Sequence, residues 1–252
     1  MSEIRIRSSD WKRVFKHLSD CRRYCSDYIA SWGPQAIPVD RIWCNLLFIR
    51  SVVATKSILI LILHDAVDDA AIILRTIFEI EFQLGAIKSD REIAVRLIQA
   101  SEAGRLKRLK RFFDSGRPLP EGMTEEEINR QLEQAKETGK ELQKIFLAKA
   151  ANLENEYRIF YSALSDAAHV SPVGLRHYLE EGDAPGSYRT NSSRSLFSPE
   201  LVMALAGATE LETLKIVKQI RGDAGDEKLE ALALENGQII DAVRQQAFQT
   251  GT

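Results

Sequence analysis

Two short stretches of this 252-residue chain carry polar side chains at spacings that could do chemistry. The first is LRTIFE, where Arg75 and Glu79 lie within an otherwise apolar run from Ala70 to Ile87. On a helix, residues four apart share one side, so Glu79 could orient the Arg75 guanidinium to hold an anion. The alternative is a boundary ion pair, which contributes only about 0.2–0.5 kcal/mol to stability.

Glu81 belongs to the same run but falls in its apolar sector, on a different side from Arg75 and Glu79. An unpaired charge in a core costs several kcal/mol. If this helix is purely structural, we therefore expect Glu81 to be paired with a residue of another helix.

The second stretch is YSALSDAAH, which contains Tyr161, Ser165 and His169. Ser165 and His169 are one helical turn apart and could hydrogen-bond. His169 also falls at the expected C-terminus of the helix, where the dipole favours imidazolium, so it could act as acid, base or anion binder. Arg158 lies three turns from His169, roughly 16 Å, and does not share a small site with it. The alternative is a solvated helix face that ends in a histidine.

Together the two motifs resemble the signature of a family of bacterial helical proteins of unknown function. That family has an Arg-x-x-x-Glu helix and a helix end of the form Tyr-x-x-Leu-Ser-x-x-x-His, and the resemblance covers about residues 40–178. It implies no established activity. It does imply a single polar cluster made of Arg75, Glu79, Tyr161, Ser165 and His169.

The sequence is more distantly similar to HEPN proteins, small helical bundles that include metal-independent ribonucleases of defence and toxin systems. Their site places an arginine a few residues before a histidine at a helix end, often with an acidic residue from another helix. Here ten residues separate Arg158 from His169, so Arg75 would have to substitute from another helix. If the protein is an enzyme, this resemblance implies a metal-independent ribonuclease.

Helical spacing of apolar residues dominates the chain, and no segment shows sustained strand alternation. The sequence therefore predicts an all-α fold, a single bundle of about seven helices over residues 1–252. We divide it into an N-terminal helix (1–39), a core bundle that carries both motifs (40–180) and a C-terminal helical pair (198–250).

Three segments outside the bundle core have their own signals. The polar segment 125–145 follows a capping-box spacing, Thr124 with Glu127, and predicts a solvent-facing helical arm. Residues 173–198 are rich in Gly, Ser, Asp and Asn and predict a loop with a short hairpin. Ser198 followed by Pro199 predicts the start of a helix.

The charge composition of the chain limits which kinds of nucleic-acid-binding protein it could be. The net charge of −2 and a pI near 6.2 argue against a dedicated nucleic-acid coat protein, although not against a local basic patch. The basic run 105–113 is such a candidate, but the acidic segment that follows it favours a solvated or mutually paired face.

The cysteines and the longest apolar run bear on the compartment. Cys21, Cys25 and Cys44 form no metal or disulfide pattern and predict buried, reduced thiols in a cytoplasmic protein. The best membrane candidate, residues 51–66, is interrupted by Lys56 and closed by His64, so we interpret it as a buried helix of a soluble protein. The polar N-terminus has no signal-peptide pattern.

Two functions follow as hypotheses. In the first, the cluster acts on a phosphate-containing ligand, RNA or a nucleotide, in a defence or toxin-like role. Arg75 holds the anion, Glu79 orients Arg75, and His169 is the general acid/base with Ser165 fixing its tautomer. No phosphate loop, HExxH, GxSxG or zinc-ligand pattern occurs, so we expect neither cofactor nor metal.

The rival hypothesis is a non-catalytic helical scaffold. In it the polar cluster specifies packing, and the helix at 125–145 recruits a helical protein partner. A homodimer is compatible with either hypothesis.

Overall fold

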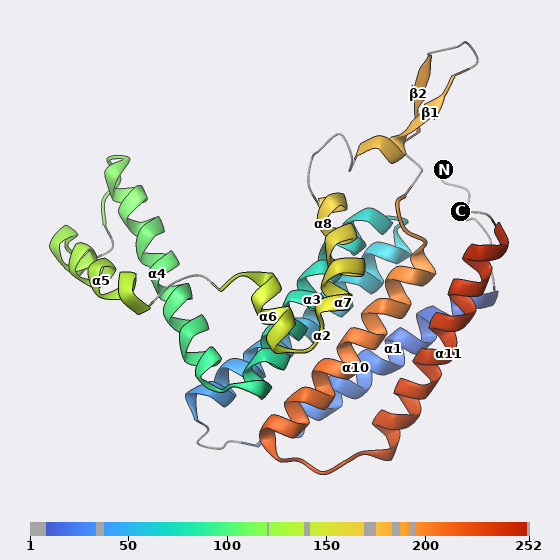
Figure 1. Ribbon diagram of the computed structural model, residues 1–252, viewed down its shortest axis with the longest axis horizontal. Coiled ribbons are helices and arrows are strands. Elements are labelled where there is room, and N and C mark those ends of the chain that lie inside the picture. Colours follow the sequence, from blue (N-terminus) through green and yellow to red (C-terminus); the bar gives the residue numbers. More distant parts are fainter. Residues whose placement is uncertain are drawn as a thin grey trace.

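The computed structural model describes residues 9–33, 38–119, 121–138, 142–168, 175–182, 187–191 and 195–250, and its fold is all-α (Figure 1). The long helices are α1 (Ser9–Ala30), α2 (Val39–Leu63), α3 (Val67–Ser89), α4 (Glu92–Asp114), α10 (Pro199–Arg221) and α11 (Glu227–Thr250). The shorter helices are α5 (Glu125–Thr138), α6 (Lys144–Ala150), α7 (Glu154–Glu156) and α8 (Ser162–Ala168), with a π-helix η1 (Tyr157–Tyr161) and a 3-10 helix η2 (Arg176–Tyr178).

The described residues therefore hold more helices than the seven or so predicted. If α7, η1 and α8 are counted as one continuous helix, there are nine, besides the single turn η2. The main reason is that the expected arm, 125–145, is divided. Its first part is α5, whereas Lys144 begins α6, which packs on α3 and buries Leu147 and Ala148. Burial of these apolar side chains draws α6 back to the bundle.

Helix α3 is the centre of the bundle. It packs against α2 and α10 on one side and against α6 and α8 on the other. This explains why its sequence is apolar nearly all round, with Leu74, Ile77 and Leu84 fully buried. Gly85 permits the close approach of α6, because a Cβ at this position would lie 2.6 Å from the Ala151 Cβ.

The C-terminal part of the bundle begins where the sequence predicts. Ser198 caps α10 by accepting a hydrogen bond from the Leu201 N–H (3.1 Å), with Pro199 in the first turn. Gly222, at φ +80°, ends α10 in the left-handed conformation. Asp226 then caps α11, accepting a 3.0 Å hydrogen bond from the Lys228 N–H.

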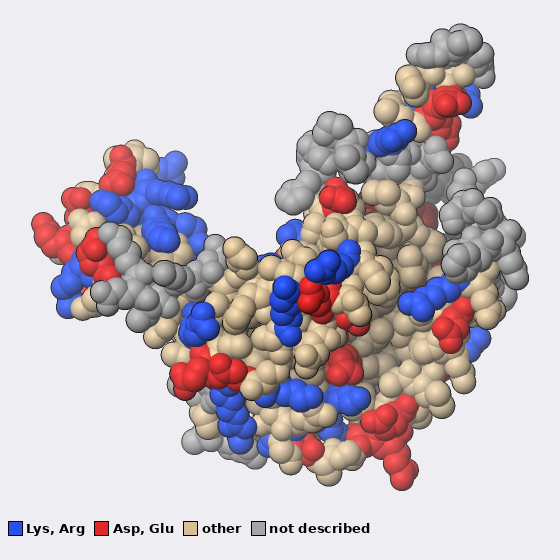
Figure 2. Space-filling model, viewed as in Figure 1, with Lys and Arg blue, Asp and Glu red and all other residues tan. Residues whose placement is uncertain are grey.

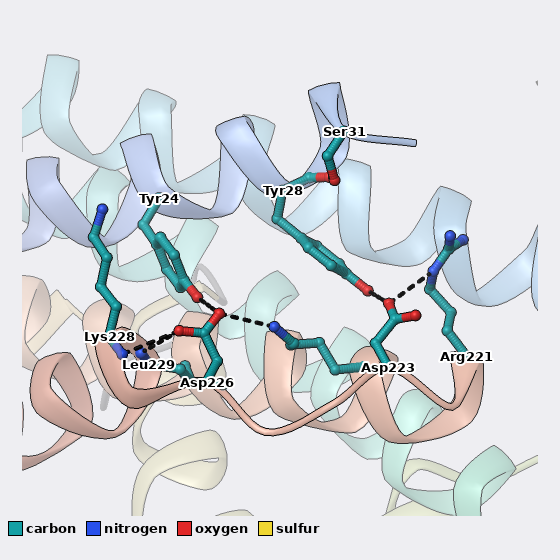
Figure 3. A network of polar contacts seen from close by, with 9 residues as sticks. Tyr24, Tyr28, Ser31, Arg221, Asp223, Asp226, Lys228 and Leu229 are labelled. Carbon is teal, nitrogen blue, oxygen red and sulfur yellow. Dashed lines mark hydrogen bonds and ion pairs between the residues drawn. The ribbon is translucent and has the colours of Figure 1, made fainter. Parts of the chain in front are cut away.

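Two tyrosines tie α1 to the turn between α10 and α11 (Figure 3). The Tyr24 hydroxyl donates to Asp226, and the Tyr28 hydroxyl donates to Asp223. Asp226 also lies 2.9 Å from the Lys218 Nζ. The hydrogen bonds from Tyr24 and Lys218 lower the pKa of Asp226 to about 2.

Two parts of the chain project from the bundle (Figure 1). One is the arm, defined as α4 together with α5, which pack on each other. The other is an antiparallel hairpin of β1 (Leu179–Glu181) and β2 (Tyr188–Thr190), with Glu180 opposite Arg189. The hairpin confirms the short strand pair expected from the sequence.

The three cysteines are free and buried, as predicted. Within the described residues, one helical segment, Arg41–Leu63, is long and apolar enough to cross a membrane by length and composition alone. Of its most apolar window, 44% is buried inside the bundle, and one such helix is weak evidence for a membrane span.

Candidate functional site

A group of four polar side chains joins three helical elements. Arg75 and Glu79 come from α3, Tyr161 from the last position of η1 and Lys144 from the first position of α6. The Arg75 Nη2 donates to the Tyr161 hydroxyl (3.0 Å), which in turn donates to the Glu79 Oε1 (2.8 Å). Arg75 Nη2 lies 3.3 Å from Glu79 Oε1, and Lys144 Nζ lies 2.8 Å from Glu79 Oε2. We call these four residues the Arg75 cluster.

Aromatic packing fixes Tyr161 in the Arg75 cluster. Its ring stacks on Tyr157 (centroids 5.0 Å apart) and meets the edge of Phe82 (5.7 Å). The Arg75 Cζ lies 5.2 Å from the centre of the same ring, a cation–π distance. The Tyr161 side chain therefore contacts α3 through both its ring and its hydroxyl.

The charge of the Arg75 cluster is unbalanced. Two cations, Arg75 and Lys144, share the single carboxylate of Glu79. Their side chains are 27% and 36% exposed, and that of Glu79 is 21% exposed, so solvent reaches all three. Burial raises the pKa of Tyr161, with Arg75 opposing and Glu79 adding to the rise, which keeps its hydroxyl a proton donor.

Of the five predicted site residues, the structure brings three into direct contact: Arg75, Glu79 and Tyr161. Ser165 is tied to them only through the backbone, since its hydroxyl donates to the Tyr161 carbonyl (2.8 Å). His169 lies outside the described residues, one position beyond the end of α8.

Arg158 is separate from the Arg75 cluster. Its guanidinium pairs with Glu154 on the preceding turn (2.7 Å), and its side chain is 69% exposed. Arg158 therefore takes no part in the Arg75 cluster, whose guanidinium among the described residues is that of Arg75 on α3.

Sequence reasoning missed Lys144. It stands within the segment expected to be a solvated arm, 65 positions after Glu79, and no local spacing links the two. The apolar residues that follow it, IFLA, were the available signal that this segment packs on the bundle.

The expectation that Glu81 is paired is wrong within the described residues. Its side chain is buried (5% exposed), and its Oε2 has no hydrogen-bond partner there. Burial raises the pKa of Glu81 well above its usual value, and the nearby carboxylates of Glu212 and Glu156 add to the rise. Burial therefore favours the protonated, uncharged form of this carboxyl group.

Glu81 also lines a surface cavity of about 370 Å³ between α3, the α7–η1 segment, α10 and α11. Apolar side chains such as Phe160 and Leu205 form much of its wall. Neither Arg75 nor Tyr161 lines it, so it is distinct from the Arg75 cluster.

The basic run on the arm is partly paired and partly free. Lys110 lies 3.5 Å from Glu125 of the acidic segment, as expected of a mutually paired face. Arg105 pairs with Glu102 on its own helix (2.5 Å). Lys107, Arg108 and Arg111 are exposed and have no ion-pair partner among the described residues. Figure 2 shows Lys and Arg side chains gathered on the side of the arm that faces the bundle.

Across the part of the chain that the structure describes, no group of three or more His, Cys, Asp or Glu side chains could hold a metal ion. Comparison with curated proteins gives no match, and comparison with solved structures gives none either. A protein-family comparison does match, over residues 41–187, a range that includes Arg75, Glu79, Lys144 and Tyr161. The chain therefore belongs to DUF5677, a family of unknown function.

Proposed function

We propose that this protein binds a phosphate-containing ligand, RNA or a nucleotide, at the Arg75 cluster. The observation that carries the proposal is the excess of positive charge there: two solvent-accessible cations, Arg75 and Lys144, share one carboxylate. A phosphate group would accept hydrogen bonds from both cations, and Glu79 would keep the guanidinium oriented. Lys and Arg side chains are among the groups that contact phosphates in proteins that bind nucleic acids.

RNA is the ligand that we favour. The exposed cations of α4, Lys107, Arg108 and Arg111, would add contacts to further phosphates of a longer chain. A cytoplasmic location in a bacterial cell is part of the proposal, supported by the three buried free cysteines.

The narrower form of the proposal is a metal-independent ribonuclease of the HEPN type, in a defence or toxin-like role. His169 would remove the proton of a ribose 2′-hydroxyl as it attacks the adjacent phosphate, and would then protonate the leaving 5′-oxygen. Arg75 would stabilise the charge on the phosphate. Since the Ser165 hydroxyl donates its hydrogen bond to the Tyr161 carbonyl, Ser165 would orient His169 by accepting a hydrogen bond from the imidazole N–H.

The test compares Arg75→Gln and Lys144→Gln with Arg158→Gln, a matched change of an exposed arginine outside the Arg75 cluster. Binding of single-stranded RNA and of a nucleotide is measured by fluorescence anisotropy, and RNA cleavage is measured with EDTA present. We expect each cluster variant to weaken RNA binding at least about tenfold, or about 1.4 kcal/mol, and Arg158→Gln to change it little. Wild-type protein that binds neither ligand at low salt would refute the proposal.

A helical scaffold is the second candidate, and one observation favours it. The Arg75 cluster joins α3, α6 and η1 through side chains that already pair with one another. If packing is its whole role, Arg75→Gln lowers the melting temperature while the wild type shows no RNA or nucleotide affinity. Under the ligand hypothesis, affinity falls in a variant that is still folded.

A further inference from the structure

Helix α2 exposes a long aliphatic stripe to solvent. Its side chains are between 37% and 52% exposed, and they are Ile42, Leu46, Ile49, Val53, Ile60 and Leu63. Single exposed aliphatic residues are normal, but a contiguous row along a whole helix marks an interaction surface. The opposite face of α2 is a normal core face, on which Phe48, Ile58 and Ile62 are buried.

The spacing of the stripe identifies the kind of surface that fits it. Its positions alternate by four and three residues, and Lys56 occupies the place where the series would otherwise have a gap. This is the heptad pattern of a helix that packs lengthwise against another helix, with one polar residue in the seam. None of the described helices of this chain covers it, since the stripe is exposed.

We propose that the stripe is a self-association surface, on which α2 packs against α2 of a second copy of this chain. A twofold axis would pass close to Val53, with the two helices antiparallel. Ile42 then faces Leu63 of the other copy, and Leu46 faces Ile60.

The position of Lys56 favours the antiparallel arrangement. Two parallel helices would place the two Lys56 side chains directly opposite each other in an apolar seam, which is costly for like charges. Antiparallel pairing about Val53 separates them by roughly 10 Å along the helix axis and sets each beside Ile49 of the other copy.

The area of the stripe agrees with a reversible dimer. The six aliphatic side chains expose roughly 500 Å² per copy, so pairing would bury roughly 1,000 Å² in total, the lower limit for a specific interface. A lipid bilayer is less favoured, because Arg50 and Lys56 lie on this helix and its other face is part of the bundle core.

The test is the mass of the full chain by sedimentation and light scattering between micromolar and about 100 micromolar concentration. We expect the wild type to reach twice the 28.4 kDa of one chain. Val53→Glu, which puts two carboxylates at the axis, should give a monomer, and Lys56→Ile should dissociate less readily than the wild type. Leu234→Glu is the matched control, because Leu234 is 67% exposed on α11 and lies outside the stripe.

Cross-linking checks the direction of the helices. Leu63→Cys should not form a disulfide between copies, since the antiparallel arrangement separates the two positions by roughly 30 Å. Val53→Cys should cross-link readily. The proposal would be overturned if the wild type and the Lys56→Ile variant were both monomeric. It would also be overturned if the wild type sedimented with phosphatidylglycerol vesicles and the Val53→Glu variant did not. Neither result bears on RNA binding at the Arg75 cluster.

Discussion

We expect one buried carboxyl group, that of Glu210, to make the stability of this protein depend on pH. Glu210, on α10, is fully buried, and neither of its carboxyl oxygens has a hydrogen-bond partner among the described residues. Thr55 lies nearby, but its hydroxyl donates to the Ser51 carbonyl (3.2 Å). Burial raises the pKa of Glu210 from 4.5 to about 8, although Thr55 and Arg22 oppose the rise.

The raised pKa gives a prediction with a definite sign. The folded protein holds the Glu210 proton more tightly than the unfolded chain, so this stabilisation is complete below about pH 4.5 and is lost as the pH rises towards 8. Glu210→Gln keeps the shape without a titrating group. Its stability relative to the wild type should therefore increase between pH 5 and 8, by up to about 1.4 kcal/mol per pH unit.

Urea unfolding across that pH range measures the effect of Glu210→Gln. Glu212→Gln is the control, since the Glu212 side chain is 44% exposed and two positions away. Equal pH dependence of the wild type and Glu210→Gln would show that the buried carboxyl does not titrate as described.

At this same scale, the sequence predicts pairs within one helix better than contacts between helices. The spacing of Arg75 and Glu79 predicts their ion pair, and the structure has it. It cannot predict that Lys144 reaches the same carboxylate, because that contact depends on how α6 returns to the bundle. For Glu81, the sequence predicts that it lies on the apolar side of the helix. It does not predict that its Oε2 lacks a hydrogen-bond partner among the described residues.

At the scale of elements, the link between α1 and the α10–α11 turn depends on the charge of Asp226 (Figure 3). With its pKa lowered from 3.8 to about 2, Asp226 contributes stability that is present above pH 3.8 and is lost as the pH falls towards 2. Asp226→Asn removes the charge but keeps a good helix cap. We expect it to cost roughly 1–2 kcal/mol at pH 7, a range reduced to allow for solvent screening.

Denaturation at pH 7 and at pH 2.5 checks this difference. The loss caused by Asp226→Asn should shrink at the lower pH, where the wild-type carboxylate is itself being protonated. Asp241→Asn serves as control, because Asp241 is an exposed acidic residue of α11 with no ion pair among the described residues. A loss of equal size at both pH values would mean that the cap, and not the charge, is what matters.

Helices themselves are well predicted, because apolar periodicity and the Ser198–Pro199 signal are local. The π-helix η1 is not, and it changes which residues share a side. Its hydrogen bonds span five residues, so one extra residue rotates the following helix by about 100° relative to a regular grid. Arg158 and Ser165, which a regular grid places on one stripe, therefore have separate surroundings in the structure.

For the molecule as a whole, a net charge of −2 conceals an uneven distribution. The arm carries exposed cations on the side that faces the bundle, and this charge lies outside the Arg75 cluster (Figure 2). If the proposed ligand is RNA, the arm should bind its backbone without sequence preference. A nucleotide carries few phosphate groups, so we expect its affinity to depend on the Arg75 cluster and not on the arm. Whether a ligand contacts both the arm and the Arg75 cluster thus depends on how the whole molecule distributes its charge. The amino-acid composition alone does not reveal that distribution.

A triple variant of the arm distinguishes RNA from a nucleotide as the ligand. Lys107→Gln, Arg108→Gln and Arg111→Gln together should weaken single-stranded RNA binding and lower the slope of log affinity against log salt concentration by about 2, at about 0.7 per lost phosphate contact. Nucleotide affinity should stay as in the wild type. The matched control is the triple change of Lys12, Arg13 and Lys16 to Gln on α1, which shifts the net charge equally, from −2 to −5. If both triple variants lose RNA affinity to the same extent, overall charge alone explains binding, and the arm has no role in holding RNA.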